Sequence, residues 1–310
     1  MKRERSSTRS PASDVMSGGL VSCGLFVVCG LCICYIIFKI AITGEHKETD
    51  VLTTKYLRLR QLCLVAAKLA PVEEDLCAVF GVRVCHRDPE VGQFGLHNAL
   101  MPFGTSFVEV VAPQREGTTA GRYLERRKGD GGYMVILDSE SLPRWRTHVD
   151  EIGVRIAAPL ALGDYEGMQL HPRDTGGALL EINTTRNGAD LNGPYWPAGP
   201  HWREAVSNAR VQGITGAVLQ ADDPAALAAR WGRILQRQVE RAGDGWQLQV
   251  DNARLRFVAP RDDRGDGLAG IELAVNDASG IRAAAQARGL AADATGVSVG
   301  GVHFALGSAD

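Results

Sequence analysis

The apolar positions of this chain form a pattern that occurs twice between residues 80 and 182. The recurring segments are FGVRV (Phe80–Val84), LH (Leu96–His97) and FVEVV (Phe107–Val111), then IGVRI (Ile152–Ile156), LH (Leu170–His171) and LLEI, which ends at Ile182. Each copy predicts a helix, a glycine, a strand, a strand with a histidine, a hairpin, and a last strand carrying one Glu among apolar residues. A repeated unit can pair with its copy around a pseudo-twofold axis and direct matching side chains into one shared cavity.

The segments before these strands carry helix and strand signals of their own. In the first copy, residues 57–66 alternate as a strand, and residues 70–80 have a Pro near the start, acids in the first turn and Gly81 after the end. In the second copy, residues 132–138 predict a strand, residues 141–152 a helix, and Gly153 its end. A short basic helix within residues 117–132 joins the two copies.

A stretch rich in Pro, Gly, Asn and Trp, Thr184 to Trp202, interrupts the pattern, which then returns in weaker form. A third copy includes a helix at residues 225–235 and RLRFVAP (254–260), and a fourth runs from residue 270 to residue 306. We therefore predict an α+β protein with tandem βαβββ modules in two pairs. Residues 55–190 would form the first pair, 191–211 a linker, and 212–310 a second, degenerate pair.

The N-terminus has a different composition. Gly19 to Phe38 holds no charged residue, and twenty helical residues span about 30 Å, the thickness of a bilayer core. This predicts a basic, disordered tail at residues 1–18, a transmembrane helix at 19–42 and a linker at 43–54, hence a single-pass membrane protein. In the alternative, this segment is an upstream extension outside the natural reading frame, since a domain begins afresh near Lys55, and the protein is cytoplasmic.

The composition of the chain says less about its function than the repeated pattern of apolar positions does. A formal net charge of −2 gives no electrostatic footprint for nucleic acid. The cysteines of the folded part, Cys63, Cys77 and Cys85, have no CxxC spacing and do not predict a disulfide framework.

Polar residues on apolar strand faces are the candidate chemistry. Strand alternation places Glu109 with Phe107 and Val111, and Glu181 with Leu179. It places Gln61 with Leu57, Leu59, Cys63 and Val65, while Arg58 and Arg60 point to the opposite face. A carboxylate among apolar side chains must be neutralised, paired or bound to a metal. Oxygen ligands suit hard divalent cations; alternatively each Glu pairs with an arginine or lies at a strand end in water.

At these residues the chain resembles the vicinal oxygen chelate (VOC) superfamily, which includes glyoxalases, methylmalonyl-CoA epimerase and extradiol dioxygenases. Residues 58–82 resemble its opening strand and helix, 122–138 the epimerase-type link into the second module, and LHPRDTGGALLEI (170–182) its closing hairpin. The resemblance implies half-barrels built from paired modules.

The resemblance also implies a divalent metal of the Mg, Mn, Ni or Fe class. The ligand positions correspond to Gln61, Glu109, Met134 and Glu181. Met134 stands where the family usually has His, and a thioether is a poor ligand for a hard ion, so three ligands remain: Gln61, Glu109 and Glu181. The matching positions of the second pair are Gly216, Arg256, Gly270 and Ala305, where we expect no metal.

Two functions follow from this reading. The first is a metal-dependent lyase, isomerase or epimerase acting on a small oxygenated substrate, with Glu181 and His171 as catalytic residues. His97, Tyr133 and Arg122 would bind substrate; alternatively the two histidines orient their hairpins and Arg122 belongs to a solvated helix face. The second is a non-catalytic small-molecule binding or sequestration protein of the same fold. A second copy of the chain is a further candidate partner, which would make the protein a homodimer.

The membrane prediction can be tested directly. We expect the full-length chain to stay with membranes during an alkaline carbonate wash, because a spanning helix is not released by charge repulsion, whereas residues 52–310 should be soluble. Immunoblotting of pellet and supernatant measures the partition. Release of the full-length chain by the wash would refute the anchor.

Overall fold

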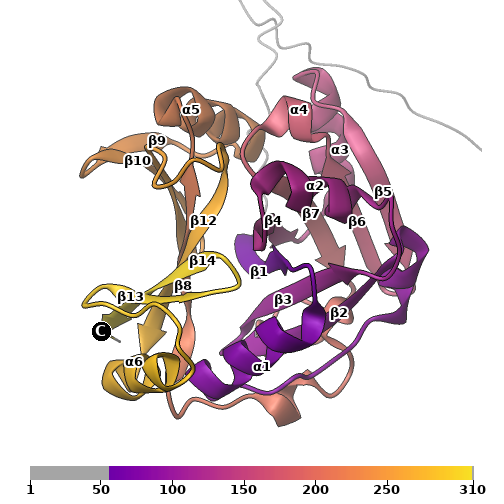
Figure 1. Ribbon diagram of the computed structural model, residues 1–310. Coiled ribbons are helices and arrows are strands. Elements are labelled where there is room, and N and C mark those ends of the chain that lie inside the picture. The colour runs from indigo at the N-terminus through magenta and orange to yellow at the C-terminus, as the bar shows by residue number, and fades with distance from the viewer. Residues whose placement is uncertain (1–55, 309–310) are drawn as a thin grey trace, which may run out of the picture. The chain divides into compact units, whose positions relative to one another are not determined.

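Two seven-stranded mixed sheets form the framework of residues 56–308, the part of the chain that the computed structural model describes (Figure 1). These residues belong to one compact unit, Leu52–Asp310. The first sheet has the order β2-β3-β1-β4-β7-β6-β5. Its strands are β1 (Leu57–Val65), β2 (Leu96–Phe103), β3 (Ser106–Pro113), β4 (Gly131–Ser139), β5 (Ile156–Leu162), β6 (Tyr165–Leu170) and β7 (Leu179–Thr185).

The second sheet repeats this topology with the order β13-β14-β12-β8-β11-β10-β9. Its strands are β8 (Val211–Gln220), β9 (Val239–Ala242), β10 (Gly245–Val250), β11 (Ala253–Val258), β12 (Gly267–Val275), β13 (Gly296–Val299) and β14 (Val302–Ser308). In each sheet two central strands pair antiparallel, β1 with β4 and β8 with β12, and each also pairs in parallel with the last strand of its own module. This confirms the α+β fold and the pseudo-twofold pairing.

Helices cover the sheets, and four of them lie where the sequence predicts a helix, at residues 70–80, within 117–132, at 141–152 and at 225–235. The helices are α1 (Leu69–Phe80), α2 (Thr119–Arg127), α3 (Leu142–Glu151), α4 (Pro172–Thr175), α5 (Pro224–Leu235) and α6 (Ala278–Ala287), with short 3₁₀ turns η1 (Pro89–Phe94), η2 (Trp196–Ala198) and η3 (Trp202–Ala205). Helix α1 ends at Gly81, whose φ of 68° is the left-handed conformation that glycine adopts at little cost. Helix α5 begins at Asp223, whose carboxylate accepts the backbone N–H of Ala226.

The first and fourth modules depart from the predicted βαβββ pattern. After α1, the segment from Val82 to Arg87 makes only an isolated bridge, His86 to Leu100, where the prediction has a strand. The chain leaves the sheet there because Asp88 caps η1 and Pro89 begins it. The fourth module is similar, because an isolated bridge from Ala292 to Val297 on β13 stands where the prediction has a strand. The second and third modules have the full pattern.

A β-bulge also changes the predicted strand faces. The register of β1 against β4 shifts between Leu59 and Gln61, so strict alternation fails at Arg60. Leu57 and Leu59 lie in the main hydrophobic core, whereas Cys63 packs in a second cluster with Tyr133 and Met134. The prediction that Gln61 shares a face with Leu57 and Leu59 was therefore wrong.

The two sheets share one hydrophobic core. Buried side chains from both sheets and from the covering helices form a continuous cluster. Strand β4 contacts β12, and Gly132 permits this approach because a Cβ there would lie 2.3 Å from the carbonyl oxygen of Leu268. The halves of the described chain are thus packed against each other and do not form separate lobes.

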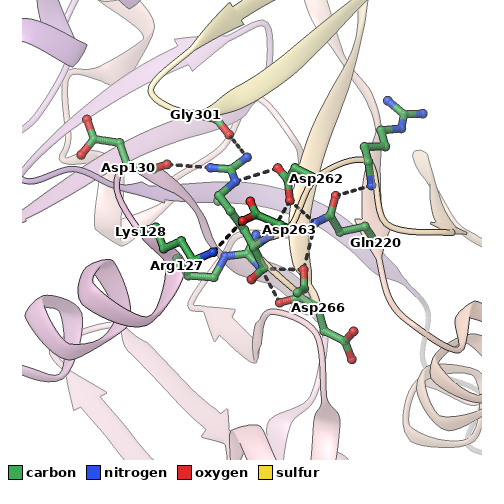
Figure 2. Close-up of polar contacts among 12 residues, drawn as sticks. Arg127, Lys128, Asp130, Gln220, Asp262, Asp263, Asp266 and Gly301 are labelled. Carbon is green, nitrogen blue, oxygen red and sulfur yellow. Dashed lines mark hydrogen bonds and ion pairs between the residues drawn. The ribbon is translucent and has the colours of Figure 1, made fainter.

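Polar contacts reinforce this packing at the end of α2 (Figure 2). The buried Arg127 guanidinium donates to the carbonyl oxygens of Arg264, Gly265 and Asp266, at 2.8, 2.7 and 2.6 Å. Lys128 forms an ion pair with Asp263. Arg127 therefore satisfies backbone acceptors, and Lys128 a carboxylate, in the loop between β11 and β12 of the other half.

The predicted transmembrane helix, 19–42, lies outside the described residues and stays a prediction. Within residues 56–308, none of the helices combines the length and the apolar character that crossing a bilayer requires.

The close approach at Gly132 generates a stability prediction. We expect Gly132→Ala to lower the free energy of unfolding by about 1–3 kcal/mol, because the added methyl forces β4 and β12 apart. Gly92→Ala is the matched control, since nothing lies within 4 Å of its Cβ position, and it should change stability by less than about 0.5 kcal/mol. Urea denaturation measures both. Equal stability of the two variants would contradict the tight packing.

Candidate functional site

A cavity of about 490 Å³ lies against the first sheet, and residues from all seven of its strands line it. The four positions that the resemblance assigns to metal ligands are among them: Gln61, Glu109, Met134 and Glu181. Tyr133, a predicted substrate-binding residue, lines the cavity too. The fold therefore brings these residues together, although they are spread over more than a hundred positions.

Strand register explains why they meet. Cys63 on β1 is level with Glu109 on β3 and Met134 on β4. Ile136 on β4 is level with Gln61 on β1 and Glu181 on β7. Residues level with one another on neighbouring strands present side chains to the same face, so two adjacent rows carry the four positions into one cavity.

Glu109 is held by neutral amides. Its two carboxylate oxygens accept hydrogen bonds from Nδ2 of Asn98 at 2.7 Å and from Nε2 of Gln61 at 2.8 Å. The Oε1 atom of Gln61 in turn accepts the hydroxyl of Tyr195 at 3.0 Å. Asn98, Gln61 and Tyr195 are all buried. The orientation of Glu109 is therefore fixed by a network from three segments of the chain.

Glu181 has a comparable set of partners. The Tyr165 hydroxyl donates to Oε1, and Nε2 of Gln169 donates to Oε2 at 3.0 Å. Asn183 makes a longer contact with Oε1, at 3.5 Å. All of these donors are uncharged, so they orient the carboxylate without neutralising it.

Burial shifts the ionisation of both acids. Removal from water raises the pKa of the Glu109 carboxyl; hydrogen bonds from Asn98 and Cys63 oppose the shift, and the nearby Glu181 charge adds to it. Burial likewise raises the pKa of Glu181, against hydrogen bonds from Tyr165, Gln169 and Asn183. No Lys or Arg within residues 56–308 forms an ion pair with either acid. Two buried carboxyls thus face the cavity, and neither has an ion-pair partner among the described residues.

The equivalent place in the second sheet is built differently. Gly216 on β8 is level with Glu272 on β12 and Arg254 on β11, and Glu272 is level with Ala305 on β14. Glu272 is paired with Arg254 at 2.6 Å and with Arg256 at 3.1 Å. A Cβ at Gly216 would lie 2.7 Å from the Glu272 carboxylate, so the position has no room for a ligand side chain. In this half the protein's own arginines neutralise the acid.

Other predicted site residues lie outside the cavity lining. His97 alternates on β2 with Leu96, which lines the cavity, and Asn98, which binds Glu109, so it faces the opposite side. His171 caps α4 by accepting the backbone N–H of Arg173. Arg122 donates to Gly117 and Thr119 at the exposed start of α2. The placement of these three residues does not support contact with substrate.

The residues that orient the two acids were not predicted from the sequence. Asn98 lies on β2, and Tyr165 and Gln169 lie on β6, strands whose registers the sequence does not reveal. Tyr195 belongs to the stretch after β7, which was read as a divider between domains. Arg58 and Arg60 donate hydrogen bonds to backbone carbonyls of this stretch, at Gly188, Ala189 and Leu191. These contacts hold the stretch against the first sheet. The only sequence signal was the pair of arginines on an otherwise apolar strand.

The family model for a glyoxalase-like domain matches residues 62–235, more than half of the chain. The chain belongs to the glyoxalase-like domain family. This match confirms the resemblance to the VOC superfamily that the sequence motifs indicated. No curated protein matches this glyoxalase-like chain.

Solved structures to which part of this chain is similar include methylmalonyl-CoA epimerases. The Streptomyces coelicolor enzyme in complex with 2-nitronate-propionyl-CoA is 21% identical, with 42% of this chain and 98% of that chain covered and a TM-score of 0.39. The Mycobacterium tuberculosis epimerase is 20% identical, covering 47% and 93%, with a TM-score of 0.38. A hypothetical protein from Bacillus halodurans C-125 is 19% identical, covering 43% and 98%, with a TM-score of 0.39.

The donor set of this glyoxalase-like site fits a divalent cation. Gln61, Glu109 and Glu181 offer oxygen atoms, two of the three are acids, and no arginine or lysine of the described chain competes for them. Their outer hydrogen bonds resemble the partners that orient metal ligands. The described residues contain no group of three His, Cys, Asp or Glu suited to a metal, because the third donor here is an amide and the fourth position is Met134.

The raised pKa of Glu181 predicts how stability depends on pH. A carboxyl whose folded-state pKa exceeds its ordinary value of 4.5 binds more protons when folded, so stability falls as pH rises from that value through the raised pKa. Glu181→Gln removes this loss, and we expect it to stabilise the metal-free protein more at pH 8 than at pH 5. The exposed Glu116→Gln is the control and should show the same effect at both. Urea denaturation of chelator-treated protein measures the difference. A Glu181→Gln effect that is equal at both pH values would refute a buried charge.

Proposed function

We propose that the protein is a metal-dependent isomerase, epimerase or lyase that acts on a small oxygenated molecule in the cavity of the first sheet. The observation that carries this proposal is the pair of buried carboxyls, Glu109 and Glu181, that form no ion pair with an arginine or lysine of the described residues. Burying such charges is costly unless they are protonated or a cation compensates them. In the second sheet two arginines supply that compensation, whereas in the first we assign it to a bound metal ion.

Gln61, Glu109 and Glu181 would hold the ion. When bound, a divalent cation supplies Lewis-acid stabilisation of negative charge that develops on adjacent substrate oxygens. Asn98 would keep Glu109 oriented, and Tyr165 and Gln169 would do so for Glu181. Burial raises the pKa of Glu181, which makes its carboxylate a stronger base for accepting a proton from a substrate carbon and returning it.

A second function is favoured by one residue, Met134. Its thioether occupies the fourth ligand position and lines the cavity at 7% exposure. A soft sulfur contributes little to binding a hard ion, so the ion would be held more weakly than in a four-ligand site. Under this reading the cavity captures a small molecule without converting it.

Metal content tests the proposal. We expect the full-length protein, purified without chelator, to bind about one equivalent of Mn²⁺ or Ni²⁺. Glu109→Gln and Glu181→Gln should each weaken binding by at least about tenfold, since each removes one charged ligand. Met134→His should strengthen Ni²⁺ binding by about tenfold or more, because imidazole is the better ligand. Elemental analysis and isothermal titration calorimetry give the values.

Glu166→Gln is the matched control, because Glu166 is an exposed acid on β6, the strand next to Glu181. It should bind metal as the wild type does. If the wild-type protein binds neither ion, and Met134→His does not create binding, the metal-dependent function is refuted and the binding-protein reading replaces it.

A further inference from the structure

Both polar and apolar side chains line the cavity. Gln61, Glu109 and Glu181 form its polar group on the central strands, whereas most of the remaining lining residues are apolar. Strand β5 supplies several of them, with the sequence IAAPLAL, and its residues Ala157, Ala158, Leu160 and Leu162 all line the cavity. A ligand that fills this space must therefore match a long apolar wall as well as the polar group.

The rim of the cavity exposes aromatic side chains. Only three large hydrophobic residues of the described chain are exposed: Phe94 at 42%, Trp196 at 42% and Ile156 at 36%. Phe94 and Trp196 both line the cavity. Trp196 packs over the turn between β5 and β6, where a Cβ at Gly163 would lie 2.6 Å from the indole ring. Large aromatics at the mouth of a pocket are suited to contact an apolar ligand.

The charged lining residues argue against a highly anionic ligand body. They are four acids, Asp88, Glu90, Glu109 and Glu181, against one arginine, Arg115. A body carrying several phosphates would meet net repulsion here. An uncharged hydrocarbon or aromatic body would instead bury apolar surface against β5 and the two aromatic side chains.

We propose that the substrate is an amphipathic molecule with a small vicinal-oxygen head and an uncharged hydrophobic body. The head binds at Gln61, Glu109 and Glu181, and the body lies along β5 and leaves the cavity between Phe94 and Trp196. The assignment of the head rests on the proposed function; the assignment of the body rests on the apolar wall and the aromatic rim alone.

Two ligand series separate these assignments. The first consists of acetohydroxamic, butyrohydroxamic, hexanohydroxamic and octanohydroxamic acid, whose heads chelate through two adjacent oxygens. The second consists of the methyl ketones with the same alkyl groups on the carbonyl carbon, namely acetone, 2-pentanone, 2-heptanone and 2-nonanone, which cannot chelate. Binding of each to the full-length protein with one equivalent of Ni²⁺ is measured by calorimetry. We expect affinity in both series to rise about fourfold per methylene until the alkyl chain fills the space along the apolar lining of the cavity.

Single substitutions show which residues contact the alkyl chain and which contact the head of the ligand. Trp196→Ala and Phe94→Ala should each weaken octanohydroxamate binding by about tenfold and leave acetohydroxamate binding unchanged. Ile156→Ala is the matched control, because Ile156 is exposed on β5 but does not line the cavity, and it should bind both hydroxamates as the wild type does. Glu181→Gln should remove the advantage of hydroxamates over the methyl ketones with the same alkyl group and preserve the dependence on chain length.

The outcomes distinguish the two proposals. A dependence on chain length without any advantage of hydroxamates supports the hydrophobic body and refutes the metal-dependent function. An advantage of hydroxamates with no dependence on chain length overturns the hydrophobic body and leaves the metal site in place. Tighter binding of acetyl-CoA than of octanohydroxamate would also overturn the hydrophobic body.

Discussion

The antiparallel pairing of β1 with β4 is the contact on which the site depends. It brings the first strands of two successive modules together at the centre of the first sheet, and each then pairs in parallel with the last strand of its own module. Because these four strands are neighbours, residues far apart in sequence become level with one another. The cavity lies where both modules contribute equivalent positions, so neither module could form it alone.

The two sheets share one topology, but their buried acids have different hydrogen-bond and ion-pair partners. In the second sheet, Glu272 is compensated by Arg254 and Arg256, and Gly216 leaves no room for a further side chain. In the first sheet, Glu109 and Glu181 are oriented by amides and a phenol, none of which carries positive charge. A buried acid paired with arginine is stable without a ligand, whereas buried acids lacking a cation favour binding one. The repeat therefore separates a half whose buried acid is paired internally from a half whose two buried acids line a cavity.

Stability and binding are also linked through the stretch after β7. Arg58 and Arg60 bind its backbone carbonyls, which positions Tyr195 to donate to Gln61 and places Trp196 at the mouth of the cavity. This segment thus contributes to the cavity in two ways. Tyr195 orients Gln61, and Trp196 supplies an aromatic side chain at the rim.

The sequence by itself determined the duplicated modules, the helices, and the candidate positions Gln61, Glu109, Met134 and Glu181, because hydrophobic periodicity and helix-end signals are local and the family motifs span few residues. Tertiary structure decided the rest. The bulge at Arg60 changed which side chains share a face with Gln61, and the register of β2 turned His97 away from the cavity while directing Asn98 toward Glu109. Bulges and registers depend on which strands become neighbours and on how tightly they pack, and such long-range contacts leave no trace in local sequence.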